Sequence, residues 1–237
     1  MIKLGVLLCD EVREELISVD GTYKAMFQRL FAPHTHDVEL LFYRIDLGEL
    51  PHHIHECDAY TSSGSHRSVY EDEPWIHAFK ELLVQFHQQK IPFFGVCFGH
   101  QMIAHALGGK VGLAPQGWGV GLHEITILKE KEWMQPIKNT LKIIVSHKDQ
   151  ILKIPEQAET LASSPHCPVS MIKCGSLTGI QGHPEYLAEF ARPLMLSRRK
   201  DIPEGILLEA DKSLSTAPDQ ELLVQWILQK IKVDLHE

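Results

Sequence analysis

Cys97 stands between two glycines, at the point where an apolar run of the sequence gives way to a helical pattern. The stretch reads "IPFFGVCFGHQMIAHALGGK" and covers residues 91–110. The apolar run predicts a buried strand, and the apolar spacing beyond Gly99 predicts a helix. The glycines allow a strand to turn steeply into a helix, as a nucleophile elbow requires. The pattern therefore favours a cysteine nucleophile over a buried structural cysteine.

A cysteine nucleophile needs a base, and the strongest candidate lies in "QGHPEY" at residues 181–186. His183 and Glu185 are two residues apart in a segment that Pro184 keeps extended, so both side chains project to the same side. The carboxylate can then accept a hydrogen bond from one imidazole nitrogen while the other nitrogen faces the sulfur. This arrangement predicts a cysteine–histidine–glutamate triad.

The α/β-hydrolases are the main alternative, because they also use an elbow of the type G-x-[SC]-x-G. In those enzymes the acid precedes the histidine in the chain, whereas here Glu185 follows His183. The order disfavours that class. His166 stays open as a second late histidine that could serve as the base.

The first half of the sequence alternates strand-like and helix-like segments. Strands are predicted at residues 3–8, 38–45, 58–63 and 91–96, and helices at residues 22–31 and 73–90. Alternation of this kind predicts an α/β fold, a doubly wound, mostly parallel sheet with helices on both faces. Reactive groups gather at the carboxyl ends of the strands in such sheets, and "SSGS" and Cys97 both fall there.

Short β-rich segments follow the elbow helix, and they predict an added β meander in the second half. These segments cover residues 123–128, 141–146, 160–164, 169–174 and 177–182. A helix is predicted at residues 220–231, where it packs onto the parent domain rather than onto a partner. Because no linker or repeat appears, we expect one domain over residues 1–237, with a helical C-terminal tail from about residue 190.

The composition argues against several classes of function. The 237 residues include 23 Lys+Arg and 31 Asp+Glu, and the formal charge of −8 disfavours a nucleic-acid partner. No apolar segment approaches the ~20 residues that span a bilayer, so no membrane partner is expected. Five cysteines leave an odd one in any disulfide pairing, which favours a reducing cytoplasm over a disulfide framework.

A group of histidines in "PHHIHEC" raises the question of a metal site. His52, His53, His55 and Cys57 lie in this one short segment. Zinc sites normally combine ligands from two separated clusters, and no matching Cys/His pair stands at a suitable distance. We therefore expect no metal here and interpret the segment as a polar loop ahead of a strand.

Two motifs resemble the signatures of one family. "GVCFGHQ" resembles the cysteine signature, and "GHPE" the histidine–glutamate signature, of the class I, triad-type glutamine amidotransferases. Further segments resemble stand-alone members that are similar to the amidotransferase domain of GMP synthase, a subgroup that includes the γ-glutamyl peptidases. They are "GTYKAMFQRLF", "SSGSHRSVYEDEPWI", "ALGGKVG", "GWGVGLHEITI" and "SHKDQI". The resemblance spans roughly residues 20–190 and implies a flavodoxin-like fold and no cofactor.

The resemblance implies an enzyme that cleaves the γ-amide of glutamine or of a γ-glutamyl compound. The cysteine would form a γ-glutamyl thioester, with release of ammonia or an amine and then of glutamate. The roles that the resemblance assigns are Cys97, His183 and Glu185 as the triad, the amides of Gly64 and Phe98 as the oxyanion hole, and Gln101, Ser146, His147 and Lys148 as the substrate pocket.

Two positions depart from the pattern of the synthetase-coupled members. This chain reads Ser63-Gly64-Ser65 where two glycines and a proline are frequent, and Lys148 stands where glycine is frequent. Both lie on the implied pocket wall, so glutamine need not be the best substrate. An inward-pointing Lys148 would favour a substrate with an extra carboxylate, such as a γ-glutamyl peptide. The alternative is that Lys148 points into water, as most lysines do.

Two functions therefore compete. One is a free-standing hydrolase of γ-glutamyl compounds that needs no partner. The other is an ammonia-donating subunit that is active only with a separate synthetase chain, since this sequence has no nucleotide-binding glycine loop of its own. A degenerate, non-enzymatic scaffold is disfavoured because all three triad residues are present.

Overall fold

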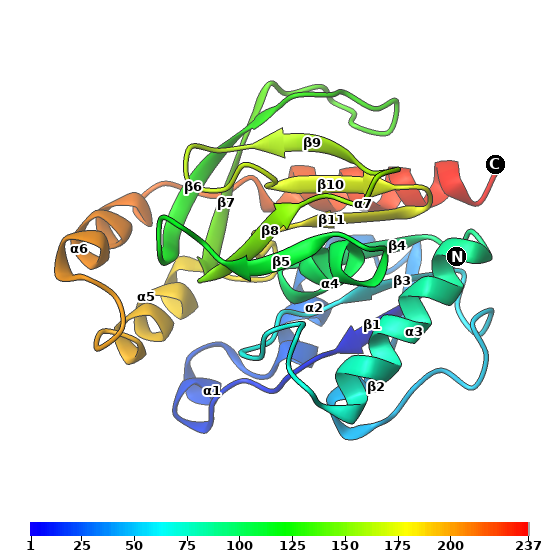
Figure 1. Cartoon of the computed structure of the whole chain (residues 1–237), viewed down its shortest axis with the longest axis horizontal. Helices are drawn as coiled ribbons and strands as arrows, with labels where there is room; N and C mark the ends of the chain where they lie inside the picture. The colour runs from blue at the N-terminus through cyan, green and yellow to red at the C-terminus, as the bar shows by residue number, and fades with distance from the viewer. Residues whose placement is uncertain (237) are drawn as a thin grey trace.

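A nine-stranded sheet forms the centre of the molecule in the computed structural model, which describes residues 1–236 (Figure 1). Its strands lie in the order β2-β1-β3-β4-β11-β10-β9-β6-β7, and β5 pairs with β8 in a second sheet. This order brings β11, which comes late in the chain, beside β4, which directly precedes Cys97.

Five strands in one half of the main sheet are parallel. They are β2 (Val38–Arg44), β1 (Ile2–Leu8), β3 (Ala59–Ser62), β4 (Phe93–Val96) and β11 (Leu177–Ile180). Every residue of β3, β4 and β11 is buried, as expected for strands that are covered on both faces. The α/β fold class predicted from the sequence is confirmed.

The other half of the sheet is antiparallel and corresponds to the predicted meander. It contains β10 (Met171–Cys174), β9 (Glu159–Ser163), β6 (Gly119–Ile127) and β7 (Thr140–His147). The meander extends the main sheet rather than forming a separate unit. The small second sheet was not predicted from the sequence, and it pairs β5 (Lys110–Leu113) with β8 (Asp149–Lys153).

Helices cover both faces of the main sheet. On one face α2 (Tyr23–Phe31), α5 (Ala188–Ser197) and α7 (Gln220–Asp234) contribute to one core cluster. On the other face α3 (Pro74–Gln88) and α4 (Phe98–Ala106) contribute to a second. The described chain also contains α1 (Glu14–Asp20), α6 (Glu204–Ser213) and short 3₁₀ turns at Ala32–His34 and Ile45–Leu47. Trp226 of α7 is fully buried, so the last helix packs onto the parent domain as predicted.

The carboxyl ends of the parallel strands meet at one edge of the sheet, and the loops that follow them carry the candidate site. Gly64 follows β3, Cys97 follows β4, and His183 follows β11. Because β4 lies between β3 and β11, these three loops are neighbours in space.

Candidate active site

Cys97 occupies the sharp turn between β4 and α4. Its backbone has φ 46° and ψ −88°, and a positive φ of this kind is unfavourable for residues other than glycine. Glycines let the helix return against the strand: a Cβ on Gly95 would lie 2.4 Å from the carbonyl carbon of Gly99. A Cβ on Gly99 would lie 1.9 Å from Ser62 Oγ. Strained backbone of this kind costs about 1–3 kcal/mol and is typical of functional sites.

His183 and Glu185 meet beside Cys97. His183 Nδ1 donates to Glu185 Oε1 over 2.8 Å, and both side chains are buried. Gly64 lies against the same group, because a Cβ there would be 2.7 Å from His183 Cε1 and 3.6 Å from Cys97 Cβ. The imidazole and the cysteine therefore face each other next to Gly64, and the three predicted triad residues are brought together.

Two contacts hold the loop that carries His183. The ring of Tyr186 stacks on the imidazole, with centroids 4.0 Å apart and 1° between the ring planes. Gln220, the first residue of α7, donates from Nε2 to the carbonyl oxygens of Pro184 over 2.6 Å and of Tyr186 over 2.5 Å. The C-terminal helix thus helps to position the candidate base.

The pKa of His183 lies well above its ordinary range. Burial opposes the charged imidazolium, but the Glu185 carboxylate and then the Cys97 sulfur outweigh burial and raise the pKa of His183 to about 10. Burial also raises the pKa of the stacked Tyr186 phenol, so that ring stays neutral. His183 therefore holds a proton beside the sulfur, where a leaving group would need one.

The backbone amides of Phe98 and Gly64 lie close to Cys97. Phe98 is the first residue of α4, and the first amides of a helix have no partner within it. Cys97 N itself is occupied, since it donates to the Ile180 carbonyl over 2.9 Å. The amide of Gly64 borders the same space, because its Cα is next to both Cys97 and His183.

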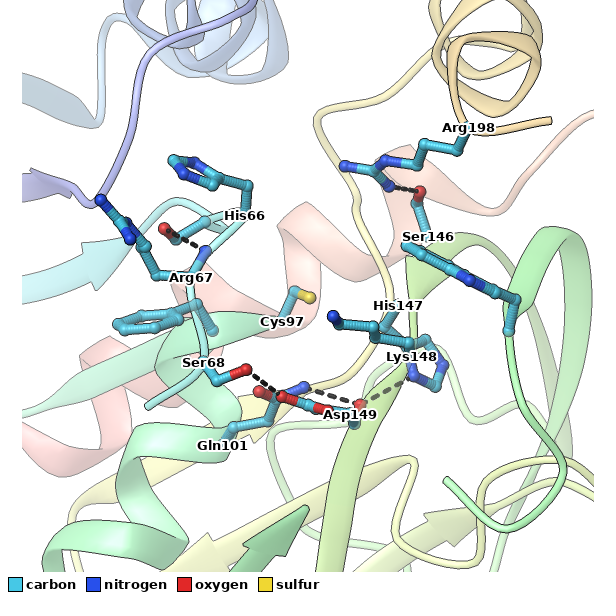
Figure 2. Close-up of a pocket in the computed structure, with 13 residues that line it drawn as sticks. His66, Arg67, Ser68, Cys97, Gln101, Ser146, His147, Lys148, Asp149 and Arg198 are labelled. Carbon is cyan, nitrogen blue, oxygen red and sulfur yellow. Dashed lines mark hydrogen bonds between the residues drawn. The ribbon is translucent and has the colours of Figure 1, made fainter. Parts of the chain in front are cut away.

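A pocket opens beside the Cys97 sulfur (Figure 2). Its lining residues are Ser65, His66, Arg67, Ser68, Cys97, Phe98, Gln101, Trp118, Ser146, His147, Lys148, Asp149 and Arg198. Asp149 is only 5% exposed, and Ser68 Oγ donates to its carboxylate. Its other oxygen, Oδ1, has no hydrogen-bond partner among the described residues. Gln101 Nε2 donates to the Asp149 carbonyl over 2.8 Å, so this part of the pocket is internally bonded.

Residues 146–148 form another part of the pocket wall, where the resemblance implied them. Ser146 Oγ accepts a hydrogen bond from the Arg198 guanidinium over 2.6 Å. His147 is buried, and its Nδ1 donates to the Asp149 carbonyl over 2.9 Å. Lys148 lines the pocket and is exposed to solvent, and Figure 2 shows its side chain extending toward the Cys97 sulfur.

Several residues of this site were not predicted from the sequence. They are Ser68, Asp149, Gln181, Tyr186 and Arg198. Gln181 Nε2 donates to the Cys97 sulfur over 3.4 Å. Asp149 ends the "SHKD" segment, and Gln181 and Tyr186 flank "GHPE". Their positions next to these motifs could have identified them as site residues. Ser68 likewise lies in the quoted segment that contains Gly64, whereas Arg198 carried no comparable signal.

Other residues that the sequence singled out lie elsewhere. The ring of His166, the alternative base, packs against those of His123 and His147, with centroids 5.4 Å and 5.6 Å away. All five cysteines are free. Within residues 1–236, no three His, Cys, Asp or Glu side chains are grouped to hold a metal ion, the segment at 52–57 included. No helix in this range is both long enough and apolar enough to cross a membrane.

Comparisons with known proteins point to one family. The family described as glutamine amidotransferase class-I matches residues 17–200. Gamma-glutamyl peptidase 3 of Arabidopsis thaliana is 32% identical over 216 residues, which cover 86% of this chain and 86% of the relative. One subunit of the glutamine-hydrolysing GMP synthase of Pyrococcus abyssi is 35% identical over 108 residues, 45% of this chain and 57% of the relative. A glutamine amidotransferase from Thermotoga maritima shares the fold, with a TM-score of 0.73 at 19% identity over 100% of this chain and 98% of that one.

Proposed function

Since the chain belongs to the class I glutamine amidotransferase family, we propose that it cleaves the γ-amide bond of its substrate through a thioester on Cys97. The family and the peptidase relatives identify it as a hydrolase that acts on glutamine or γ-glutamyl compounds. The observation that carries the thioester route is the burial of Cys97, His183 and Glu185 side by side. A reducing, cytoplasmic location would keep the thiol free.

The first step is acylation of the cysteine. The proton that His183 holds comes from the Cys97 thiol, and the sulfur attacks the γ-carbonyl carbon of the substrate. The oxygen of the tetrahedral intermediate accepts hydrogen bonds from the amides of Phe98 and Gly64, at the positive end of α4. The imidazolium then protonates the leaving nitrogen, and the C–N bond breaks.

The second step is hydrolysis of the thioester. His183 takes a proton from a water molecule, the resulting hydroxide attacks the thioester carbonyl, and the C–S bond breaks to release glutamate. Glu185 holds Nδ1–H through its 2.8 Å hydrogen bond and stabilises the imidazolium in both steps. Tyr186, stacked on the ring, fixes the plane of the imidazole.

The amino-acid end of the substrate binds on the Cys97 side. An α-ammonium group needs an acceptor, and Oδ1 of the buried Asp149 supplies one. A buried carboxylate oxygen without a hydrogen-bond partner is unfavourable in free energy. An ammonium group bound there would supply the missing partner and remove that penalty. Gln101, which is anchored on the Asp149 carbonyl, is the second polar group of this subsite.

Glutamate release by the purified chain tests the proposed function. We expect release from glutamine and from γ-glutamylglycine, and we expect Cys97→Ser to abolish both activities. Cys174→Ser is the matched control, because Cys174 is a buried cysteine on β10 that lines neither the Cys97 pocket nor the triad. If the Cys97→Ser variant released glutamate as fast as the Cys174→Ser variant, Cys97 would not be the nucleophile.

A second candidate is an ammonia-donating component that requires a separate synthetase. The observation in its favour is the similarity to the glutamine-hydrolysing GMP synthase of Pyrococcus abyssi, which covers 45% of this chain. Such a component would hydrolyse glutamine only with its synthetase and would leave γ-glutamylglycine intact. Cleavage of the dipeptide by the isolated chain favours the free-standing hydrolase. An isolated chain that hydrolyses neither substrate, and that hydrolyses glutamine once a synthetase is added, favours the ammonia donor.

A further inference from the structure

A second cavity lies on the His183 side of the site and has a volume of about 360 Å³. Cys97 lines only the first pocket, and His183 lines only this second cavity. The residues that line both are Ser65, His66, Ser146 and Arg198. Because the nucleophile faces one space and the general acid faces the other, the scissile bond of a substrate belongs where the two spaces join.

The leaving group belongs in the second cavity. His183 must reach the leaving nitrogen to protonate it, and His183 faces this cavity. Ammonia, the leaving group of glutamine, is close in size to a water molecule, which occupies about 30 Å³ in the liquid. A cavity of about 360 Å³ has room for an amine with many more heavy atoms.

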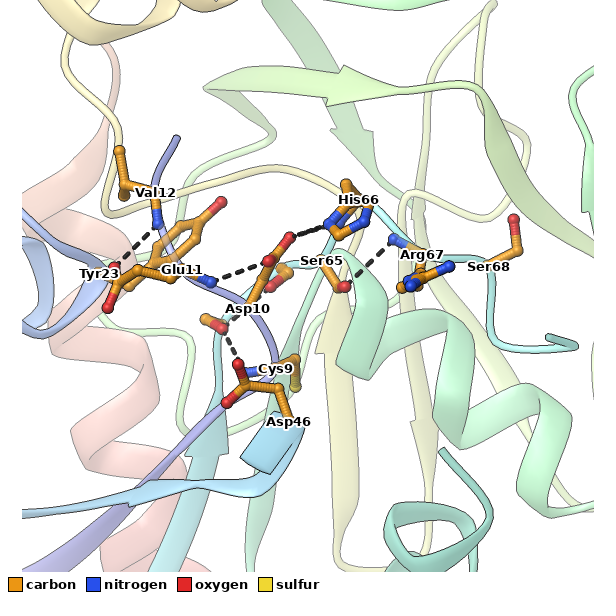
Figure 3. A network of polar contacts seen from close by, with 12 residues as sticks. Cys9, Asp10, Glu11, Val12, Tyr23, Asp46, Ser65, His66, Arg67 and Ser68 are labelled. Atoms are coloured by element: carbon orange, nitrogen blue, oxygen red, sulfur yellow. Dashed lines mark hydrogen bonds and ion pairs between the residues drawn. The ribbon is translucent and has the colours of Figure 1, made fainter. Parts of the chain in front are cut away.

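The acidic groups at this cavity already have partners. Asp10 Oδ2 accepts hydrogen bonds from the backbone amide of His66 over 2.8 Å and from its ring over 2.6 Å (Figure 3). Glu11 Oε2 pairs with Arg44 over 3.2 Å. The two carboxylates are therefore engaged in holding the loops together, and neither neutralises the arginines of the cavity.

The hydrogen bonds that the two arginines of the cavity make within the described chain go to neutral groups. Arg198 donates to Ser146 Oγ over 2.6 Å, and its guanidinium lies 5.2 Å from the centre of the Trp118 ring. Arg13 donates to Ser197 Oγ over 3.3 Å. Among residues 1–236, neither guanidinium forms an ion pair with a carboxylate. Each guanidinium has five N–H donors, so both retain donors for a bound anion.

We propose that the second cavity binds the leaving group and that Arg198, together with the more exposed Arg13, recognises a carboxylate on it. This inference rests on the proposed γ-glutamyl hydrolase function. A guanidinium binds a carboxylate through two parallel hydrogen bonds, and half-buried Arg198 is partly shielded from competing water. The preferred substrates are then γ-glutamyl amino acids and γ-glutamyl peptides, whose departing amine carries a free carboxylate.

The reaction at this site balances without any further reagent. The amide C–N bond breaks as the C–S bond of Cys97 forms, and the proton held by His183 goes to the departing amine. One water molecule then releases glutamate and restores the thiol. The amino acid or peptide leaves the Arg198 cavity as the first product.

A matched pair of substrates tests the leaving-group site. γ-Glutamylglycine and γ-glutamylglycinamide differ only in the carboxylate beyond the scissile bond. We expect wild type to prefer γ-glutamylglycine in kcat/KM by about ten- to a hundredfold, the worth of one hydrogen bond between charged groups. Arg198→Met should remove most of this preference, and Arg198→Lys should retain part of it.

The control variant is Arg192→Met. Arg192 lies on α5, close to Arg198 in the chain, but it pairs with Asp211 over 2.8 Å and does not line the cavity. Its preference should equal that of wild type. Because the preference compares two substrates of one enzyme preparation, a partly unfolded variant does not distort it.

The possible failures can be told apart. A wild-type preference near one overturns the leaving-group site but leaves the hydrolase function intact. An equal loss on both substrates in Arg198→Met also overturns it, and assigns Arg198 to the γ-glutamyl end instead. If wild type turns over neither substrate, the hydrolase function fails, and the leaving-group site fails with it.

Discussion

The spaces on the two sides of the candidate triad differ in size and in chemistry. The pocket beside Cys97 has a free volume of about 50 Å³, whereas the cavity beside His183 has about 360 Å³. Hydrogen bonds from Ser68 and Gln101 to Asp149 fix the wall of the small pocket. The large cavity presents Arg13 and, where it joins the small pocket, Arg198, and neither forms an ion pair with a carboxylate of the described chain. The small pocket suits a group that is the same in every substrate, and the large cavity suits one that varies.

The charges divide in the same way. On the Cys97 side, the free oxygen of Asp149 offers a negative charge to an ammonium group. Arg198, which lines both spaces, offers a positive charge to a carboxylate at the junction with the His183 side, and Arg13 adds another within the large cavity. A γ-glutamyl peptide carries an ammonium group at its glutamyl end and a carboxylate beyond the scissile bond, so its charges complement both spaces, whereas glutamine fills only the first.

The largest effect is expected from the base that serves both sides. His183→Ala should lower kcat about 10³- to 10⁴-fold for every γ-glutamyl substrate, because the proton acceptor and the acid for the leaving group are both lost. Glu185→Gln should lose about ten- to a hundredfold less, since the imidazole remains and only its orientation suffers. The rate of glutamate release at saturating substrate measures kcat for both variants. A wild-type rate in either variant would contradict the assignment of the triad.

A methyl group at the junction of the two spaces should have the next largest effect. Gly64→Ala puts a Cβ 2.7 Å from His183 Cε1, so the imidazole must move. A displacement of about 1 Å costs on the order of a hundredfold in rate, and we expect a loss of kcat of that size with little change in Tm. Gly205→Ala, whose Cβ would meet nothing within 4 Å, is the control that should keep full activity. Equal activity of the two variants would show that the triad does not depend on this contact.

Lys148 is expected to matter less than Arg198. Its side chain is exposed, so its charge is screened, and Lys148→Ala should change kcat/KM for γ-glutamylglycine by no more than about tenfold. The preference for γ-glutamylglycine over γ-glutamylglycinamide should survive this change. If Lys148→Ala reduced the preference more than Arg198→Met does, the carboxylate would bind on the Cys97 side, and the comparison between the two spaces would be reversed.

The smallest expected effect concerns stability under the Cys97 pocket. Burial, with a smaller contribution from neighbouring histidines, lowers the pKa of His147 to about 3 and that of His123 to about 4. The unfolded chain binds these protons near pH 6.5, and the folded chain binds them only well below it. The free energy of unfolding should therefore fall, on the order of 1 kcal/mol or more, as the pH drops from about 6.5 towards 4.

Urea unfolding at about pH 7 and about pH 5 measures this loss. His147→Gln keeps a donor for the Asp149 carbonyl but does not titrate, so its stability should depend less on pH. A fall in stability that is as steep in His147→Gln as in wild type would contradict the assignment of the acid sensitivity to His147.

The candidate triad could be predicted because the sequence pattern of each member is local. The glycines around Cys97 are required by its own backbone turn and by the close return of α4, so sequence and conformation agree within a few residues. His183 and Glu185 are two positions apart and bond directly to each other. Such short-range constraints are visible in one sequence without any knowledge of the packing.

The remaining site residues depend on long-range packing, which the sequence does not display. Ser68 and Asp149 are 81 positions apart and meet only once the sheet has formed. Arg198 follows α5, which begins where the helical tail was predicted but carries no motif that links its end to the site. β8 begins two residues after β7 ends, so its short apolar run was not separated from the preceding strand.

Trapping the acyl-enzyme tests the central claim most directly. γ-Glutamyl p-nitroanilide has a good leaving group, so deacylation should limit turnover and the thioester should accumulate. We predict a burst of one nitroaniline per enzyme and, after acid quenching and mass spectrometry, a γ-glutamyl group on Cys97 and on none of the other four cysteines. Cys97→Ala should show neither the burst nor the adduct. A γ-glutamyl group on another cysteine, or a burst that Cys97→Ala retains, would contradict the account.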